Sequence, residues 1–243
     1  GNSMGWYIAL GLGGVMTDEN AYHLIHTMGS MMRNGIIGGQ IIYPVVDENW
    51  RLDEAKKEKI MSEIENAGAH VSIFLGGYLV IGGEQKSLNM LLQNLPKKDK
   101  YPFQLPFHGA FHTSLLDSLS NQAKGILSES IFQKPSVPLV DGVGKIWSPF
   151  STNISELYQY TLGHQVTKTY DFSTSVKVAL KEFCPEKLVL LGPGNTLGGS
   201  LGQILIENNW LDINSKTAFL SLQKETPFLL SMGLESQREI ISN

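Results

Sequence analysis

Apolar runs alternate with segments of helical periodicity along most of the 243-residue chain. Residues 6–12 are apolar, and residues 18–33 have a helical pattern that begins at Thr17 or Asp18, two good N-caps, and ends before Gly35. Alternation of strand and helix signals predicts an α/β fold. The second half continues it, with helices near 114–128, 154–163 and 173–183, a buried strand at 187–191, and a helix from about residue 197.

The middle of the chain has an order of elements of its own. The pattern predicts a strand, a helix, two strands around a Gly76-Gly77 turn, a helix and a strand, at residues 36–46, 53–67, 71–81, 85–95 and 101–107. This β-α-β-β-α-β order is that of a ferredoxin-like unit. We therefore expect residues 36–107 to form a ferredoxin-like subdomain, inserted in a core of residues 1–35 and 108–243.

Composition and charge argue against several classes of partner and ligand. The chain is 42% hydrophobic and 17% charged, and its net charge of −4 without a Lys/Arg stripe argues against nucleic acid. No run reaches the ~18 apolar residues of a membrane span, and no export leader opens the sequence. The single cysteine, Cys184, cannot form an intrachain disulfide, so we expect a reducing cytoplasm. No cluster has metal-ligand spacing, so we expect no metal.

The first five residues, Gly1-Asn2-Ser3-Met4-Gly5, match the pattern G-x-S-x-G. In this pattern a strand turns sharply into a helix and leaves the serine hydroxyl exposed as a nucleophile. The backbone N–H of Met4 would then be one donor to an oxyanion, helped by the positive end of the helix. Taken alone, such a short pattern fits an ordinary turn equally well.

A serine nucleophile needs a base, which must be one of the six histidines. His108 and His112 both fall in a glycine-rich segment between a predicted strand and a predicted helix, where a side chain can reach a pocket. The other four lie on a predicted helix or have no surrounding motif.

Several segments resemble the malonyl-CoA:acyl-carrier-protein transacylase family. Residues 1–10 are similar to its G-H-S-x-G-E-x-x-A-L elbow, and residues 109–116, Gly-Ala-Phe-His-Thr-Ser-Leu-Leu, are similar to its catalytic-histidine segment. Residues 191–197 resemble its G-P-G-x-x-L turn and Val140-Asp141-Gly142 the stretch before that turn. Gln165 falls where the family has a glutamine followed by W-x-x-S-V. The similarity runs from residue 1 to about residue 206.

The resemblance implies an α/β-hydrolase-like acyltransferase core in which Ser3 is the nucleophile and His112 its base. The backbone carbonyl of Gln165 would orient the imidazole, as an aspartate does in a Ser-His-Asp triad. It also implies ping-pong transfer from acyl-CoA to the phosphopantetheine thiol of an acyl carrier protein, in fatty acid or polyketide biosynthesis, with no permanently bound cofactor. The resemblance places four residues in the substrate pocket: Met28, Phe74, Phe111 and Asn195.

The chain departs from the family pattern at residues expected near the substrate. Met28 stands where malonyl-specific members carry an arginine, and Phe74 where a polar residue is expected. Asn2 and Trp6 replace the histidine and glutamate of the elbow. A buried carboxylate without a charged partner costs several kcal/mol, so these changes favour neutral acyl groups over malonyl.

Two alternatives to the transferase remain open. The less polar site also suits an acyl-thioester hydrolase. An inactive module could instead dock an acidic carrier protein through Lys97, Lys98 and Lys100, which otherwise form a solvated loop.

The elbow pattern also needs a strand before the serine, yet only Gly1 and Asn2 precede Ser3. We therefore expect an N-terminal segment of the core, including the loop with the second oxyanion donor, to be missing from this chain.

Overall fold

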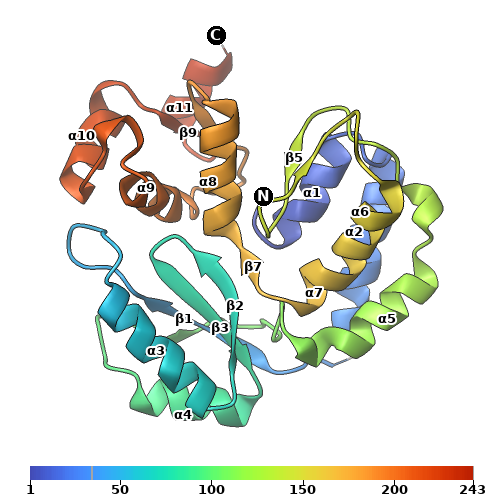
Figure 1. Cartoon of the computed structure of the whole chain (residues 1–243), viewed down its shortest axis with the longest axis horizontal. Coiled ribbons are helices and arrows are strands. Elements are labelled where there is room, and N and C mark those ends of the chain that lie inside the picture. The colour runs from blue at the N-terminus through green and yellow to red at the C-terminus, as the bar shows by residue number, and fades with distance from the viewer. Residues whose placement is uncertain (34, 243) are drawn as a thin grey trace.

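The computed structural model describes residues 1–33 and 35–242, and it has an α/β fold. In Figure 1 one group of helices lies on the right and a sheet with two covering helices lies at the lower left. A C-terminal group lies above the sheet, and α8 (Phe172–Phe183) stands between the groups. The right-hand helices are α1 (Met4–Leu12), α2 (Asp18–Arg33), α5 (Asp117–Ile126), α6 (Ile154–Gln159) and α7 (Gln165–Thr167).

The largest sheet has five strands in the order β4-β1-β3-β2-β7. Its pairs are antiparallel except β2 with β7, which is parallel. Helices α3 (Glu54–Asn66) and α4 (Gln85–Asn94) pack on one of its faces. The strands are β1 (Gly39–Pro44), β2 (His70–Leu75), β3 (Tyr78–Gly83), β4 (Phe103–Gln104) and β7 (Tyr170–Asp171).

This sheet separates two hydrophobic cores because successive residues of a strand point to opposite faces. In β1, Ile41 and Tyr43 are buried in the core under α3 and α4, whereas Ile42 packs against the larger core on the other face. The predicted order of elements over residues 36–107 is confirmed. The last strand is shorter than the predicted 101–107, because Pro102 and Pro106 flank it and proline has no N–H for the ladder.

Helix ends follow the capping residues that the sequence offers. The Thr17 hydroxyl accepts a hydrogen bond from the Asn20 amide (3.2 Å), and Asp53 accepts one from the Lys56 amide (3.0 Å), so α2 and α3 begin where predicted. The predicted helix at 154–163 is longer and irregular. It begins as α6, passes through a π-helical turn at Tyr160–His164 and ends as α7.

The strand expected to be buried at 187–191 is not buried. Strand β8 (Leu188–Leu190) pairs in parallel with β9 (Leu229–Ser231) in a two-stranded sheet. Val189 is 43% exposed and Leu191 is 65% exposed. An apolar run predicts burial only when other elements cover both faces of the strand, and the described part of the chain leaves this one partly uncovered.

The remaining elements are short helices and one small sheet, and no helix within residues 1–33 and 35–242 is long and apolar enough to cross a membrane. Their bounds are η1 Ser114–Leu116, η2 Glu129–Ile131, β5 Leu139–Val140, β6 Ile146–Trp147, α9 Gly198–Glu207, η4 Trp210–Asp212, α10 Lys216–Glu225 and α11 Glu235–Ser242.

Candidate active site

Ser3 lies at a sharp turn immediately before α1. Its backbone has φ 54° and ψ −114°, a conformation that residues with a side chain rarely adopt. A Cβ on Gly1 would lie 2.3 Å from the carbonyl oxygen of Gly5, so the turn requires glycine there. The Ser3 Oγ lies 2.7 Å from Nε2 of His112, which is 109 residues away in the sequence. The structure therefore brings together the two residues that the motifs singled out.

The end of a helix holds His112 in place. Its amide donates to the carbonyl of Val166 (3.0 Å), and its Nδ1 lies 2.5 Å from the carbonyl oxygen of Gln165. Helix α7 ends at Thr167, so these two carbonyls have no intrahelical donor and are free to accept. A hydrogen bond from Nδ1–H fixes the tautomer in which Nε2 is the acceptor for the Ser3 hydroxyl.

Four further contacts, which the motifs did not predict, hold this pair in place. The Gln165 side chain donates to the Ser3 carbonyl (3.2 Å), and the Tyr7 hydroxyl donates to the Gln165 amide oxygen (3.1 Å). The ring of Tyr170 packs against His112, with centroids 5.4 Å apart, and its hydroxyl donates to the Gly1 carbonyl (2.6 Å). Tyr7 could have been found, because it lies one helical turn after Ser3, but nothing in the sequence marks Tyr170.

Burial determines the charge of His112, which is 3% exposed. Desolvation lowers its pKa from the ordinary 6.5 to about 4, while the hydrogen bond to the Gln165 carbonyl acts in the opposite direction. At neutral pH, Ser3 therefore faces an uncharged imidazole that can accept a proton.

The same pKa difference predicts a pH dependence of folding. Because the unfolded state takes up a proton near pH 6.5 and the folded state only near 4, stability is lost as pH falls through this window. Between about pH 7 and about pH 4.5, we expect the wild type to lose on the order of 2–3 kcal/mol more than His112→Gln, which cannot titrate. Denaturant unfolding of both proteins at the two pH values measures this. Equal losses would contradict the burial of an uncharged His112.

A cavity of about 720 Å³ opens beside Ser3 and His112. It lies between α1 and α2 on one side and strands β1, β2 and β3 of the sheet on the other. Its walls are mainly apolar, and Asn2 contributes a buried side-chain oxygen that has no hydrogen-bond partner among the described residues. The apolar wall residues include Ile25, Met28, Met32, Ile42, Ile73, Val80, Leu105 and Phe111.

Met4 also lines the cavity, and as the first residue of α1 it has no intrahelical acceptor for its N–H. Trp6 does not line it, because the side chain is fully buried and its indole N–H donates to Thr161 (3.1 Å). Asn195 is exposed and is not among the lining residues, although the next residue, Thr196, is.

Phe74 does not line the cavity either; it packs against the core under α3 and α4. A β-bulge between Val71 and Ile73 reverses the alternation of side chains in β2. As a result Ile73 and Leu75 face the cavity and Phe74 points away from it.

A chain of hydrogen bonds begins at the cavity wall, which Gln40 and His108 line, and continues into the buried Ser72. Nδ1 of His108 lies 2.8 Å from the amide oxygen of Gln40, whose amide nitrogen donates to Ser72 (2.6 Å). The Ser72 hydroxyl in turn donates to the carbonyl of Phe111 (2.7 Å), the residue before His112. Sequence reasoning missed Gln40 and Ser72, because a lone polar residue in an apolar strand carries no motif.

The described residues contain no group of three or more His, Cys, Asp or Glu side chains placed to hold a metal ion.

Comparison with known proteins gives two curated relatives, both from Bacillus subtilis. The chain is 25% identical to the polyketide biosynthesis acyltransferase homolog PksD over 207 residues, 84% of this chain and 59% of that protein. It is 22% identical to the malonyl CoA-acyl carrier protein transacylase over 209 residues, 84% of this chain and 63% of that protein. The predicted resemblance to the transacylase family is confirmed. No family model matches the chain.

Solved structures extend this likeness to the fold. The acyl-carrier-protein S-malonyltransferase of Burkholderia pseudomallei matches 99% of this chain and 71% of its own, with a TM-score of 0.75 and 17% identity. The transacylase-like α/β fold is therefore shared, whereas the chain spans only about 60% of the length of the curated relatives.

Proposed function

We propose that this chain carries the nucleophile and the base of an acyltransferase that moves acyl groups from coenzyme A to an acyl carrier protein. The observation that carries the proposal is the 2.7 Å contact between Ser3 and His112 at the wall of a large apolar cavity. The names of the relatives, a polyketide acyltransferase homolog and a malonyl transacylase, support the same reaction class. We place the reaction in fatty acid or polyketide biosynthesis in the cytoplasm.

The proposed chemistry has two half-reactions. Nε2 of His112 takes the proton of the Ser3 hydroxyl while Oγ attacks the thioester carbonyl of acyl-CoA. His112 then gives this proton to the departing sulfur, which leaves an acyl ester on Ser3 and free coenzyme A. In the second half, the phosphopantetheine thiol gives its proton to His112 and attacks the ester, and Ser3 regains a proton as the new thioester forms. In both halves the amide of Met4, the first residue of α1, would donate to the oxyanion.

Gln165 acts by positioning in this mechanism. Its carbonyl holds the imidazole, and the negative end of α7 favours the charged ring that forms when the Ser3 proton is taken. Its amide group holds the Ser3 backbone at the same time.

We further propose that the acyl group is neutral. Met28 is 8% exposed and lines the cavity, and no lysine or arginine among residues 1–33 and 35–242 lines it. A malonyl carboxylate would lose its hydration there without gaining a charged partner.

As for domains, we propose a ferredoxin-like subdomain at residues 36–107, supported by the strand order β4-β1-β3-β2 and by two helices on one face. Residues 1–35 and 108–243 then form an α/β-hydrolase-like core.

The proposed function is tested by mass spectrometry of the intact protein with a panel of acyl-CoAs, followed by addition of a carrier protein bearing phosphopantetheine. We expect one acyl adduct per chain, on Ser3 by peptide mapping, that disappears as acylated carrier accumulates. Release of free acid at the same rate without carrier would contradict transfer and indicate a hydrolase. No adduct with any acyl-CoA, together with binding of the carrier, would indicate an inactive docking module.

A further inference from the structure

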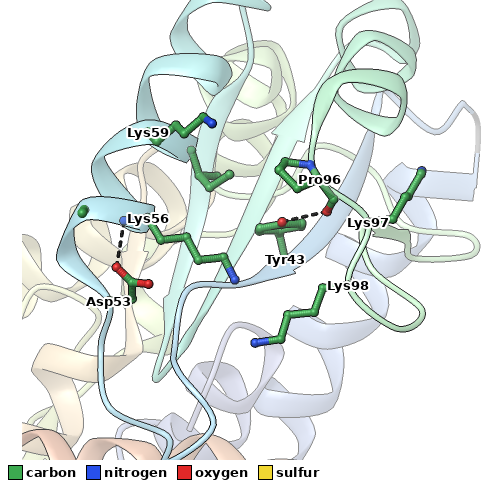
Figure 2. Close-up of a pocket in the computed structure, with 9 residues that line it drawn as sticks. Tyr43, Asp53, Lys56, Lys59, Pro96, Lys97 and Lys98 are labelled. Atoms are coloured by element: carbon green, nitrogen blue, oxygen red, sulfur yellow. Dashed lines mark hydrogen bonds between the residues drawn. The ribbon is translucent and has the colours of Figure 1, made fainter.

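A second hollow, of about 530 Å³, lies on the far side of the sheet from Ser3. Tyr43 forms part of its wall, and this residue belongs to the core under α3 and α4 rather than to the core beside the Ser3 cavity. Figure 2 shows the hollow between the start of α3 and the loop at residues 96–98. Its lining combines four lysines, one aspartate and an apolar part: Tyr43, Asp53, Ala55, Lys56, Lys59, Ile60, Pro96, Lys97 and Lys98.

Two ammonium groups face each other across this hollow. In Figure 2 the side chains of Lys56, from α3, and Lys98, from the loop, point toward one another beside Tyr43. Nζ of Lys56 lies 5.2 Å from the centre of the Tyr43 ring, and Nζ of Lys98 donates to the Val46 carbonyl at a long 3.4 Å. Within the described residues, neither ammonium has a carboxylate within 4.0 Å.

This arrangement is electrostatically unfavourable when the hollow is empty. Both lysines are half-buried, where the repulsion of like charges is less screened than in water. Burial and the charge of Lys98 both lower the pKa of Lys56, and Asp53 only partly opposes them. An anion between the two ammoniums would remove this repulsion.

The backbone on both sides of the hollow is held in place. Asp53 caps α3 through the Lys56 amide, and the Tyr43 hydroxyl donates to the Pro96 carbonyl (2.8 Å). Lys98 and Tyr101 exchange two backbone hydrogen bonds of 3.0 and 2.9 Å. The two lysine backbones are therefore fixed before any ligand arrives, which lowers the ordering cost of binding.

We propose that this hollow binds the phosphate group of a small phosphorylated molecule between Lys56 and Lys98. Phosphate suits the site because its several oxygens can accept charge-assisted hydrogen bonds from two lysines at once. An acidic protein surface would instead meet the exposed lysines of the lining, Lys59 and Lys97, before the half-buried pair. The site is on the opposite face of the sheet from Ser3, so it stands apart from the proposed acyl transfer.

Calorimetric titration with inorganic pyrophosphate at about 0.05 M ionic strength, where screening is weak, tests the proposal. We expect saturable binding, and a dissociation constant about tenfold weaker or more in Lys56→Gln and in Lys98→Gln, because each loses one charge-assisted hydrogen bond. Lys86→Gln is the matched control: this exposed lysine on α4 belongs to the same segment but does not line the hollow. Ser3→Ala should bind as the wild type does, which separates this result from the fate of the acyltransferase proposal.

Asp53→Asn gives a gain-of-binding test that a misfolded variant cannot imitate. Asparagine caps a helix as well as aspartate does, so α3 should persist while the one negative charge of the lining disappears. Pyrophosphate should then bind several-fold more tightly. Non-saturable binding of pyrophosphate, or an equal loss of affinity in Lys86→Gln, would overturn the proposal. Binding of an acyl carrier protein is measured in parallel, and the proposal also fails if Lys56→Gln and Lys98→Gln lose carrier binding but keep pyrophosphate binding.

Discussion

Acyl transfer should fall by about 10⁴-fold or more when Ser3 is replaced by alanine, because no other group takes the covalent intermediate. His112→Ala should cause a similar loss, and the double variant should lose little more, since the two residues act as one unit. Stopped-flow measurement of coenzyme A release gives the acylation rate of each variant, and intact-mass detection gives the yield of the acyl adduct.

Ser118→Ala is the control for this pair. Ser118 is an exposed serine of α5 whose hydroxyl accepts a weak hydrogen bond from Gln122 (3.3 Å), so its loss should change neither the rate nor the fold. An adduct of equal yield in Ser3→Ala would place the nucleophile elsewhere and refute the proposed role of the elbow.

Met28→Arg should shift the acyl preference toward malonyl by about 10²-fold, because a guanidinium offers the carboxylate two parallel charge-assisted hydrogen bonds. The measured quantity is the ratio of single-turnover acylation rates with malonyl-CoA and acetyl-CoA. In the wild type this ratio should favour acetyl, since the wall at Met28 is apolar.

Met28→Leu keeps an apolar side chain of similar size without adding charge, so it should leave the ratio near its wild-type value. A wild type that already prefers malonyl would show that another group pairs with the carboxylate, and the proposal of a neutral acyl group would fail.

Local signals in the sequence were sufficient for much of this fold. The hairpin around Gly76-Gly77 and the starts of α2 and α3 were predicted, because glycine and the caps Thr17 and Asp53 act on their immediate neighbours. Ser3 and His112 were paired from two motifs, without any information on distance.

What could not be predicted depends on contacts between distant segments. The family resemblance places Phe74 in the substrate pocket, whereas the β-bulge at Val71–Ile73 turns its side chain to the other face of the sheet. The exposure of β8 likewise depends on which elements lie beside it. The hydroxyls of Tyr170 and Ser72 donate to the carbonyls of Gly1 and Phe111, which belong to distant segments of the chain.

The position of the carbonyl that holds the His112 imidazole depends on the number of residues in the π-helical turn at Tyr160–His164, which precedes Gln165. An α-helix advances by about 100° per residue, so one residue more or fewer before Gln165 rotates its carbonyl by about that angle. The oxygen that now accepts from Nδ1 of His112 would then point away from the ring. Natural variation in this segment should therefore include almost no insertions or deletions, a constraint that sequence identity alone does not measure.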